Sequence, residues 1–169
     1  MAPSKNRWPE APLLLGALAA LLCLALAHAS EIVLGLKPCE LCLAQRQVYW
    51  IAAGVALALA VAVRLRPRFV AAALLILAVC FLAQAALAAY HAGVEWRWWP
   101  GPARCASGGG RALTTGDMQA LLSGKQEKVV QCDVAAIRIA GLSMAGWNAI
   151  TALGLSIACL VGARTWSRQ

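Results

Sequence analysis

Four long apolar runs divide this chain, and short polar segments separate them. Each run has room for a helix that crosses a hydrocarbon core roughly 30 Å thick. Alanine and leucine fill the runs, with little of the alternating pattern that a transmembrane β-barrel requires. The pattern predicts an all-α integral membrane protein, a single domain over residues 1–169 whose four transmembrane helices cover about residues 11–29, 43–63, 69–89 and 139–163.

Two polar segments, at about residues 30–42 and 90–138, join these helices on one side of the membrane. The second segment opens with the tryptophans of residues 95–100, an aromatic anchor typical of the membrane interface. Further along, residues 114–117 resemble a helix cap, and apolar side chains follow at residues 118–122. This predicts a short amphipathic helix that lies flat on the membrane surface.

Composition agrees with a membrane protein, because 62% of the residues are hydrophobic and only 13% are charged. The net charge of +8 raises the question of nucleic acid binding. The basic residues, however, form no concentrated patch with interleaved aromatic side chains. We therefore expect a lipid bilayer, and no nucleic acid, as the surroundings of this protein.

Seven of the fifteen basic residues lie densely in short segments, and the other eight are spread over the two longer polar segments. The density of the basic residues, and not their number, is what applies the positive-inside rule here. The dense group consists of Lys5, Arg7, Arg64, Arg66, Arg68, Arg164 and Arg168. This predicts that both termini and the turn between the second and third helices are cytoplasmic. Residues 27–29 also imitate a signal peptide cleavage site; the loops would face the same way if the chain were cut there.

A Cys-x-x-Cys pair, Cys39 and Cys42, opens the second helix. Pro38 suits the first turn of a helix, so we expect Cys39 within that turn, where unpaired N–H groups and the helix dipole favour a thiolate. Arg46 follows one turn after Cys42 on the same helix face. It is predicted either to stabilise negative charge near Cys42 or merely to extend its side chain to the interface.

Two further cysteines, Cys105 and Cys132, lie in the long polar segment. Four cysteines allow three pairings, of which proximity favours Cys39–Cys42 and leaves Cys105–Cys132. A zinc site with four thiolates is the alternative, although the later pair lacks the spacing of a zinc knuckle. The absence of a histidine directly after Cys42 excludes ordinary c-type haem attachment.

The remaining cysteines and histidines have simpler explanations. Cys23, Cys80 and Cys159 lie deep in apolar runs, where thiols stay protonated and unreactive. His28 and His91 fall at the outer ends of helices, where interfacial placement accounts for them. A disulfide-handling protein must also pass two electrons onward, and no haem motif, nucleotide loop or metal cluster is visible in the sequence. By elimination, the expected acceptor is a membrane quinone, either ubiquinone or menaquinone.

Several segments resemble the DsbB family of bacterial disulfide bond formation proteins. They are KPCELCLAQR at residues 37–46, YHAGVEW at 90–96, the lone Cys105, and Cys132 followed by GLSMAGW at 141–147. The resemblance covers nearly the whole chain. Its main departure from the best-known members is a short, glycine-rich segment between Cys105 and Cys132.

The resemblance implies a quinone-dependent oxidoreductase of the inner membrane that reoxidises a periplasmic thioredoxin-fold dithiol protein, DsbA. By analogy, Cys105 forms the mixed disulfide with that partner and Cys132 resolves it. Electrons then reach Cys39–Cys42, and Cys42 faces the quinone with Arg46 beside it. His91 becomes a candidate quinone contact only through this resemblance. The main redox rival, the vitamin K epoxide reductase type of bundle, carries its Cys-x-x-Cys on a later helix.

Overall fold

The computed structural model describes residues 8–102, 105 and 132–168. Four long helices dominate the described part of the chain: α1 (Ala11–Leu34), α2 (Glu40–Leu65), α3 (Val70–Glu95) and α5 (Met144–Ser167). Each is long and apolar enough to span a membrane, since a helix rises about 1.5 Å per residue against a hydrocarbon core of about 30 Å. The predicted four-helix membrane bundle is confirmed.

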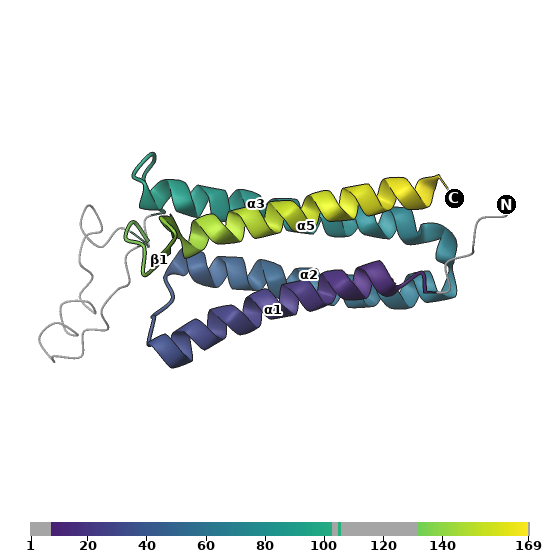
Figure 1. Ribbon diagram of the computed structural model, residues 1–169, viewed down its shortest axis with the longest axis horizontal. Coiled ribbons are helices and arrows are strands. Elements are labelled where there is room, and N and C mark those ends of the chain that lie inside the picture. The colour runs from purple at the N-terminus through teal and green to yellow at the C-terminus, as the bar shows by residue number, and fades with distance from the viewer. Residues whose placement is uncertain (1–7, 103–104, 106–131, 169) are drawn as a thin grey trace, which may run out of the picture.

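The helices run side by side and alternate in direction, so the bundle has two distinct ends (Figure 1). At one end lie the start of α1, the end of α5 and the short 3-10 helix η1 (Pro67–Phe69), which joins α2 to α3. At the other end lie the α1–α2 link and a two-stranded antiparallel hairpin, β1 (Arg138–Ile139) and β2 (Leu142–Ser143). This second end holds the candidate chemistry.

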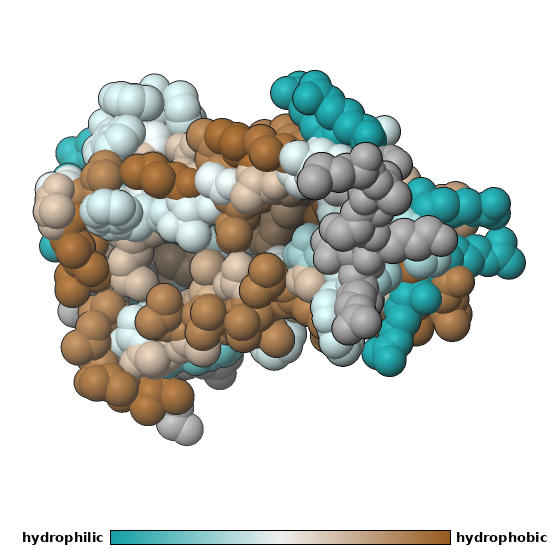
Figure 2. All heavy atoms as spheres, turned by 45° about the vertical axis from the view of Figure 1, so that its right-hand side comes forward, coloured by the Kyte–Doolittle hydropathy of each residue, from teal (hydrophilic) through white to brown (hydrophobic). Residues whose placement is uncertain are grey.

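Large apolar side chains cover the outside of the bundle, and small ones fill much of its inside. Figure 2 shows hydrophobic residues along the length of the molecule and hydrophilic ones gathered at its right-hand end. Ala52, Ala56 and Ala88 are fully buried, and small residues of this kind let membrane helices approach closely. A Cβ at Gly16 would lie 2.6 Å from Leu77 Cδ2, so the Leu77 side chain would have to shift to admit a larger residue there.

Helix α2 begins at Glu40, before the predicted residue 43 but after Pro38, so the prediction that Pro38 and Cys39 belong to its first turn is wrong. Cys39 is instead the N-cap, with extended backbone, and its Sγ accepts a hydrogen bond from the backbone N–H of Cys42 at 3.3 Å. This bond satisfies one of the N–H groups that a helix start leaves unpaired. The Cys39 sulfur therefore lies over the N-terminus of α2.

Helix α5 begins later than predicted, because residues 139–143 form the β1–β2 hairpin instead. Ala140 and Gly141 have φ values of 51° and 83°, and two positive φ values in succession are typical of a type I′ hairpin turn. Ser143 then caps α5, and its Oγ accepts a hydrogen bond from the Gly146 N–H at 3.1 Å. The hairpin residues are themselves mostly apolar, so a prediction from hydropathy alone starts this helix several residues too early.

Helices α1 and α3 continue beyond their predicted ends, to Leu34 and Glu95. The signal-peptide-like residues 27–29 lie inside α1, which packs along α2. The extra turns also bring Glu31 and His91 into helices, where their positions around the α2 start are fixed.

The aromatic segment after α3 folds into a compact cluster. The ring centroids of Trp96 and Trp98 lie 4.7 Å apart, and those of Trp98 and Trp99 lie 5.9 Å apart. The indole N–H of Trp99 donates a hydrogen bond to the Tyr90 carbonyl at 2.9 Å. The amphipathic helix predicted at residues 114–122 lies outside the described residues.

Candidate active site

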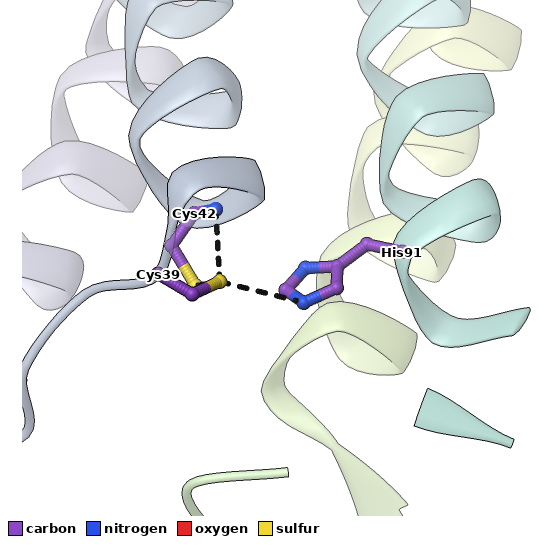
Figure 3. Close-up of side chains that lie close together, drawn as sticks. All are labelled: Cys39, Cys42 and His91. Atoms are coloured by element: carbon purple, nitrogen blue, oxygen red, sulfur yellow. Dashed lines mark hydrogen bonds between the residues drawn. The ribbon is translucent and has the colours of Figure 1, made fainter. Parts of the chain in front are cut away.

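Cys39 and Cys42 form a pair of neighbouring thiols at the start of α2. Their sulfurs lie 2.8 Å apart and are hydrogen-bonded (Figure 3). An S–S bond measures about 2.05 Å, so a small side-chain movement suffices to close a disulfide. Cys39 is buried, and Cys42 is partly exposed.

The environment of Cys39 does not favour a thiolate, contrary to the prediction from its place at a helix start. Its hydrogen bond with the Cys42 thiol and, after that, its burial raise the pKa of Cys39 above the ordinary value. Backbone N–H groups of Cys42 and Leu41 oppose this shift only in part. Cys39 therefore rests as a thiol, and it needs a further hydrogen-bond donor to become an effective nucleophile.

His91 reaches across from α3 to this pair (Figure 3). Its Nε2 lies 3.6 Å from Cys39 Sγ and 3.8 Å from Glu95 Oε1, and the imidazole is buried. Glu95 Oε2 is also buried and has no hydrogen-bond partner among the described residues. The structure thus brings the sequence candidate His91 into contact with the cysteine pair, and it adds Glu95, which the sequence analysis did not single out.

Cys105 and Cys132 are joined by a disulfide, which confirms the predicted pairing of these two residues. Both are buried in one apolar cluster together with Cys39 and neighbouring side chains of α2 and α3. The backbone of Cys132 also lies against the His91 imidazole. The loop disulfide and the Cys-x-x-Cys pair therefore share one small buried cluster.

Arg46 is held by α1 rather than extended freely into the interface. Its guanidinium donates hydrogen bonds to Glu31 Oε2 at 2.6 Å and to the Ala27 carbonyl at 3.1 Å, and His28 Nδ1 lies 3.5 Å away. Only 14% of the Arg46 side chain is exposed. The sequence analysis missed Glu31, although an acid next to a long apolar run is a signal for a specific partner.

A series of polar side chains connects His91 to α5. Gln45 Nε2 lies 2.8 Å from His91 Nδ1, on the ring side opposite Cys39. Asn148 donates a hydrogen bond to Gln45 Oε1, and the Tyr49 hydroxyl donates one to Asn148 Oδ1. The sequence analysis missed all three partners. Their signal was available, because polar groups inside apolar helices are costly unless they are paired.

A cavity of about 260 Å³ opens beside the cysteine pair. Cys39, Cys42, Arg46 and His91 all line it, and α1 and α5 supply most of the opposite wall. Its apolar lining includes Leu24, Leu26, Leu36, Met144 and Trp147. The cavity therefore offers a flat apolar ligand both hydrocarbon contacts and a few polar groups next to reactive sulfur.

Cys39, Cys42 and His91 also lie close enough together to share a metal ion, with their donor atoms within 4.8 Å of one another. The zinc site with four thiolates, the alternative from the sequence, would also need Cys105 and Cys132 as ligands. In this structure Cys105 and Cys132 form a disulfide and have no thiolate to offer. The arrangement is a disulfide near a pair of thiols rather than one zinc site with four thiolates.

The other cysteines lie within the helices. Cys159 is buried in the core cluster, and Cys80 packs against the same cluster. Cys23 packs there too but also lines the cavity. That these three thiols take no part in the chemistry stays a prediction.

With the geometry described, the chain can be compared with known proteins. The family described as disulfide bond formation protein DsbB matches residues 9–162. The chain belongs to the DsbB family. The matched range contains both cysteine pairs and all but the last turns of α5. No curated protein and no solved structure matches the chain.

Family membership establishes a membrane protein of disulfide bond formation with redox-active cysteines, as the resemblance of residues 37–46 implies. It does not favour the vitamin K epoxide reductase type of bundle. Together with the four spanning helices, it makes this DsbB-family protein a multi-pass membrane oxidoreductase.

Proposed function

We propose that this DsbB-family protein is a thiol:quinone oxidoreductase of the bacterial inner membrane. It reoxidises a periplasmic dithiol protein of the DsbA type and passes the electrons to a membrane quinone. One observation carries the proposal: the Cys39–Cys42 pair shares a buried cluster with the loop disulfide and also lines an apolar cavity. A pair in this position can exchange with the first and deliver electrons into the second.

The first half of the reaction is thiol–disulfide exchange. In each exchange a thiolate attacks one sulfur of a disulfide, a new S–S bond forms, and the departing sulfur keeps the electron pair of the broken bond. A partner dithiol that reduces Cys105–Cys132 loses two electrons and two protons and gains a disulfide. Exchange with an oxidised Cys39–Cys42 then restores the loop disulfide and leaves two thiols at the membrane.

The second half regenerates the disulfide of Cys39 and Cys42. A quinone in the cavity supplies the two-electron oxidation and leaves as the hydroquinone with two protons. The cavity volume of about 260 Å³ is slightly smaller than the roughly 300–1,000 Å³ of typical ligand pockets. It suits a quinone because only the ring has to enter, while the apolar tail can remain in lipid. Arg46 carries five N–H donors and lines the cavity with part of them turned toward α1.

The orientation of the protein follows from its charges. The end of the bundle with the start of α1, the end of α5 and η1 carries the arginines of the α2–α3 turn, Arg64, Arg66 and Arg68. Under the positive-inside rule this end is cytoplasmic. The cysteine pairs then face the periplasm, an oxidising compartment in which disulfides persist.

The proposal is tested by the quinone content and the turnover of the purified protein. We expect close to one quinone per chain in the absorption spectrum and in a solvent extract. We also expect oxidation of a DsbA-type dithiol to depend on added quinone. Free thiols that bind zinc, with no quinone and no quinone-dependent oxidation, would instead support a metal-binding protein. Thiol titration with and without a chelator distinguishes these results.

Arg46→Met is expected to weaken quinone use while the fold is kept. The change removes a nearly buried charge that lines the cavity but keeps most of the side chain's length. A hydrogen bond to a charged group contributes about 1.5–3 kcal/mol, so we expect the quinone KM to rise, or kcat to fall, roughly ten- to hundredfold. Steady-state kinetics at varied quinone concentration measure this effect. Arg46→Lys is expected to be milder, since it keeps the charge and loses only the planar fork.

The matched control is Arg64→Met, because Arg64 lies on the same helix, is largely exposed and does not line the cavity. It is expected to leave the kinetics near those of the wild type. Equal kinetics in the wild type and in Arg46→Met would mean that Arg46 serves only to fasten α2 to α1.

A further inference from the structure

Hydrogen bonds link Tyr49, Asn148 and Gln45 to His91, and we call this series the polar chain. The order of donors and acceptors along it decides which imidazole nitrogen carries the hydrogen. We propose that this chain holds His91 as the tautomer with hydrogen on Nε2, and that this N–H stabilises a thiolate on Cys39. The positioning residues are Tyr49, Asn148 and Gln45. The proposal deepens the proposed function and rests on it only for the use that is made of the thiolate.

The direction is set at the α5 side. The Tyr49 hydroxyl donates to Asn148 Oδ1, so the amide nitrogen of Asn148 is turned toward Gln45 and donates to Gln45 Oε1. The carbonyl oxygen of Gln45 is thereby engaged, and its amide nitrogen faces His91 Nδ1 at 2.8 Å. An amide nitrogen only donates, so Nδ1 must be the acceptor.

Other neighbours of Tyr49 do not offer its hydroxyl hydrogen a better acceptor than Asn148 Oδ1. Cys23 lies beside the hydroxyl, but a thiol sulfur is a weak acceptor. Gln84 lies nearby as well, yet neither polar atom of its amide has a hydrogen-bond partner among the described residues. The chain therefore runs from Tyr49 toward His91 and not in the opposite direction.

The surroundings of Nε2 are compatible with the same tautomer. In a neutral imidazole one nitrogen donates and the other accepts, and the hydrogen bond at one nitrogen fixes the role of the other. With Nδ1 accepting from Gln45, Nε2 carries the hydrogen. Nε2 faces Cys39 Sγ at 3.6 Å and Glu95 Oε1 at 3.8 Å, and the backbone of Cys132 lies against the same imidazole.

This N–H is the further hydrogen-bond donor that the Cys39 sulfur needs. The Cys39 sulfur already accepts the backbone N–H of Cys42 as the cap of α2, and Nε2–H adds a second donor from α3 (Figure 3). Hydrogen bonds to the charged form of a group favour that form. The titratable groups that face this sulfur are Cys42 from α2 and, from α3, His91 and the more distant Glu95.

The stabilised thiolate has a defined use in the proposed reaction. When the membrane pair is reoxidised, the Cys39 thiolate forms the new bond to the Cys42 sulfur, and two electrons leave to the quinone. The two protons lost by the thiols balance the two that the hydroquinone gains. His91 keeps its own hydrogen throughout, so it acts as a donor and not as a base.

The tautomer is measured directly by NMR of the full-length protein labelled with ¹⁵N and ¹³C at histidine. The chain has only two histidines, and His91→Gln assigns their signals. We expect the hydrogen of His91 on Nε2 in the wild type. Tyr49→Phe removes one hydroxyl and is expected to give a mixture of tautomers, as is Gln45→Leu. Ser156→Ala is the matched control: it removes one buried hydroxyl, which donates to the Ala78 carbonyl elsewhere between α3 and α5, and is expected to change nothing.

The effect on Cys39 is measured by its alkylation rate in the reduced protein, with peptide mapping and a chelator present. Loss of the donor is expected to raise the pKa of Cys39 and slow its alkylation near neutral pH by about tenfold, the change that one pKa unit gives. Hydrogen on Nδ1 in the wild type, or unchanged tautomer and alkylation in both Tyr49→Phe and Gln45→Leu, would overturn the proposal. Neither measurement uses quinone or a partner protein, so failure here is distinct from failure of the proposed function.

Discussion

Replacement of Cys42 by alanine is expected to reduce catalytic turnover with quinone to background. Cys42 is one half of the pair whose sulfurs lie 2.8 Å apart at the cavity wall, and without it no disulfide can re-form there. The loop disulfide Cys105–Cys132 is untouched by the change. The variant is therefore expected to oxidise about one equivalent of partner dithiol by exchange and then stop. Partner oxidation, followed together with quinone reduction, measures both parts.

Cys80→Ala and Cys159→Ala are the controls, because both residues pack in or against the core cluster and neither lines the cavity. They are expected to turn over at nearly the wild-type rate. Sustained turnover in Cys42→Ala would show that electrons bypass this pair, and the relay as proposed would then be wrong.

The four-helix fold was predictable because the hydrophobicity of the chain is enough to locate its membrane-spanning helices. A membrane span needs about 20 predominantly apolar residues, and four such runs are plain in the sequence. The helix starts were less predictable. The apolar residues of the β1–β2 hairpin look helical to a hydropathy argument, and only Gly141 and the capping Ser143 indicate the turn. Pro38 and Cys39 were misplaced for a similar reason, since a cysteine is not among the usual capping residues.

The site was predictable where its residues are close in sequence. The spacing of Cys39, Cys42 and Arg46 follows from one helix, and the Cys105–Cys132 pair was what remained. The partners that determine the properties of the site come from other helices. Asn148 is 103 residues from Gln45, and Glu31 is 15 residues from Arg46. No periodicity in the sequence relates such positions. Only the packing of the helices shows that Asn148 on α5 orients His91 on α3 through Gln45 on α2.

Burial also changes the expectation for the loop pair. The small residues near Cys105 predict an accessible thiol, yet Cys105 is 4% exposed and Cys132 1%. A partner protein must therefore displace part of the covering chain before its thiolate reaches either sulfur. The cysteine that the partner attacks is then the one that is uncovered. The next exchange, with the Cys39–Cys42 pair, depends on which sulfur is released near Cys39.

A partner dithiol protein that lacks its resolving cysteine is expected to become trapped as a disulfide on Cys105. Attack there releases the electron pair onto Cys132, whose backbone lies against His91 and which lies in the same cluster as Cys39. The released thiolate thus lies next to the pair that it must reduce. Non-reducing electrophoresis and peptide mapping identify the linked residue. Cys105→Ser is expected to abolish the adduct, and Cys80→Ala to leave it intact. A link to Cys132, or to Cys39 or Cys42 directly, would reverse the order of the relay while leaving the oxidase function in place.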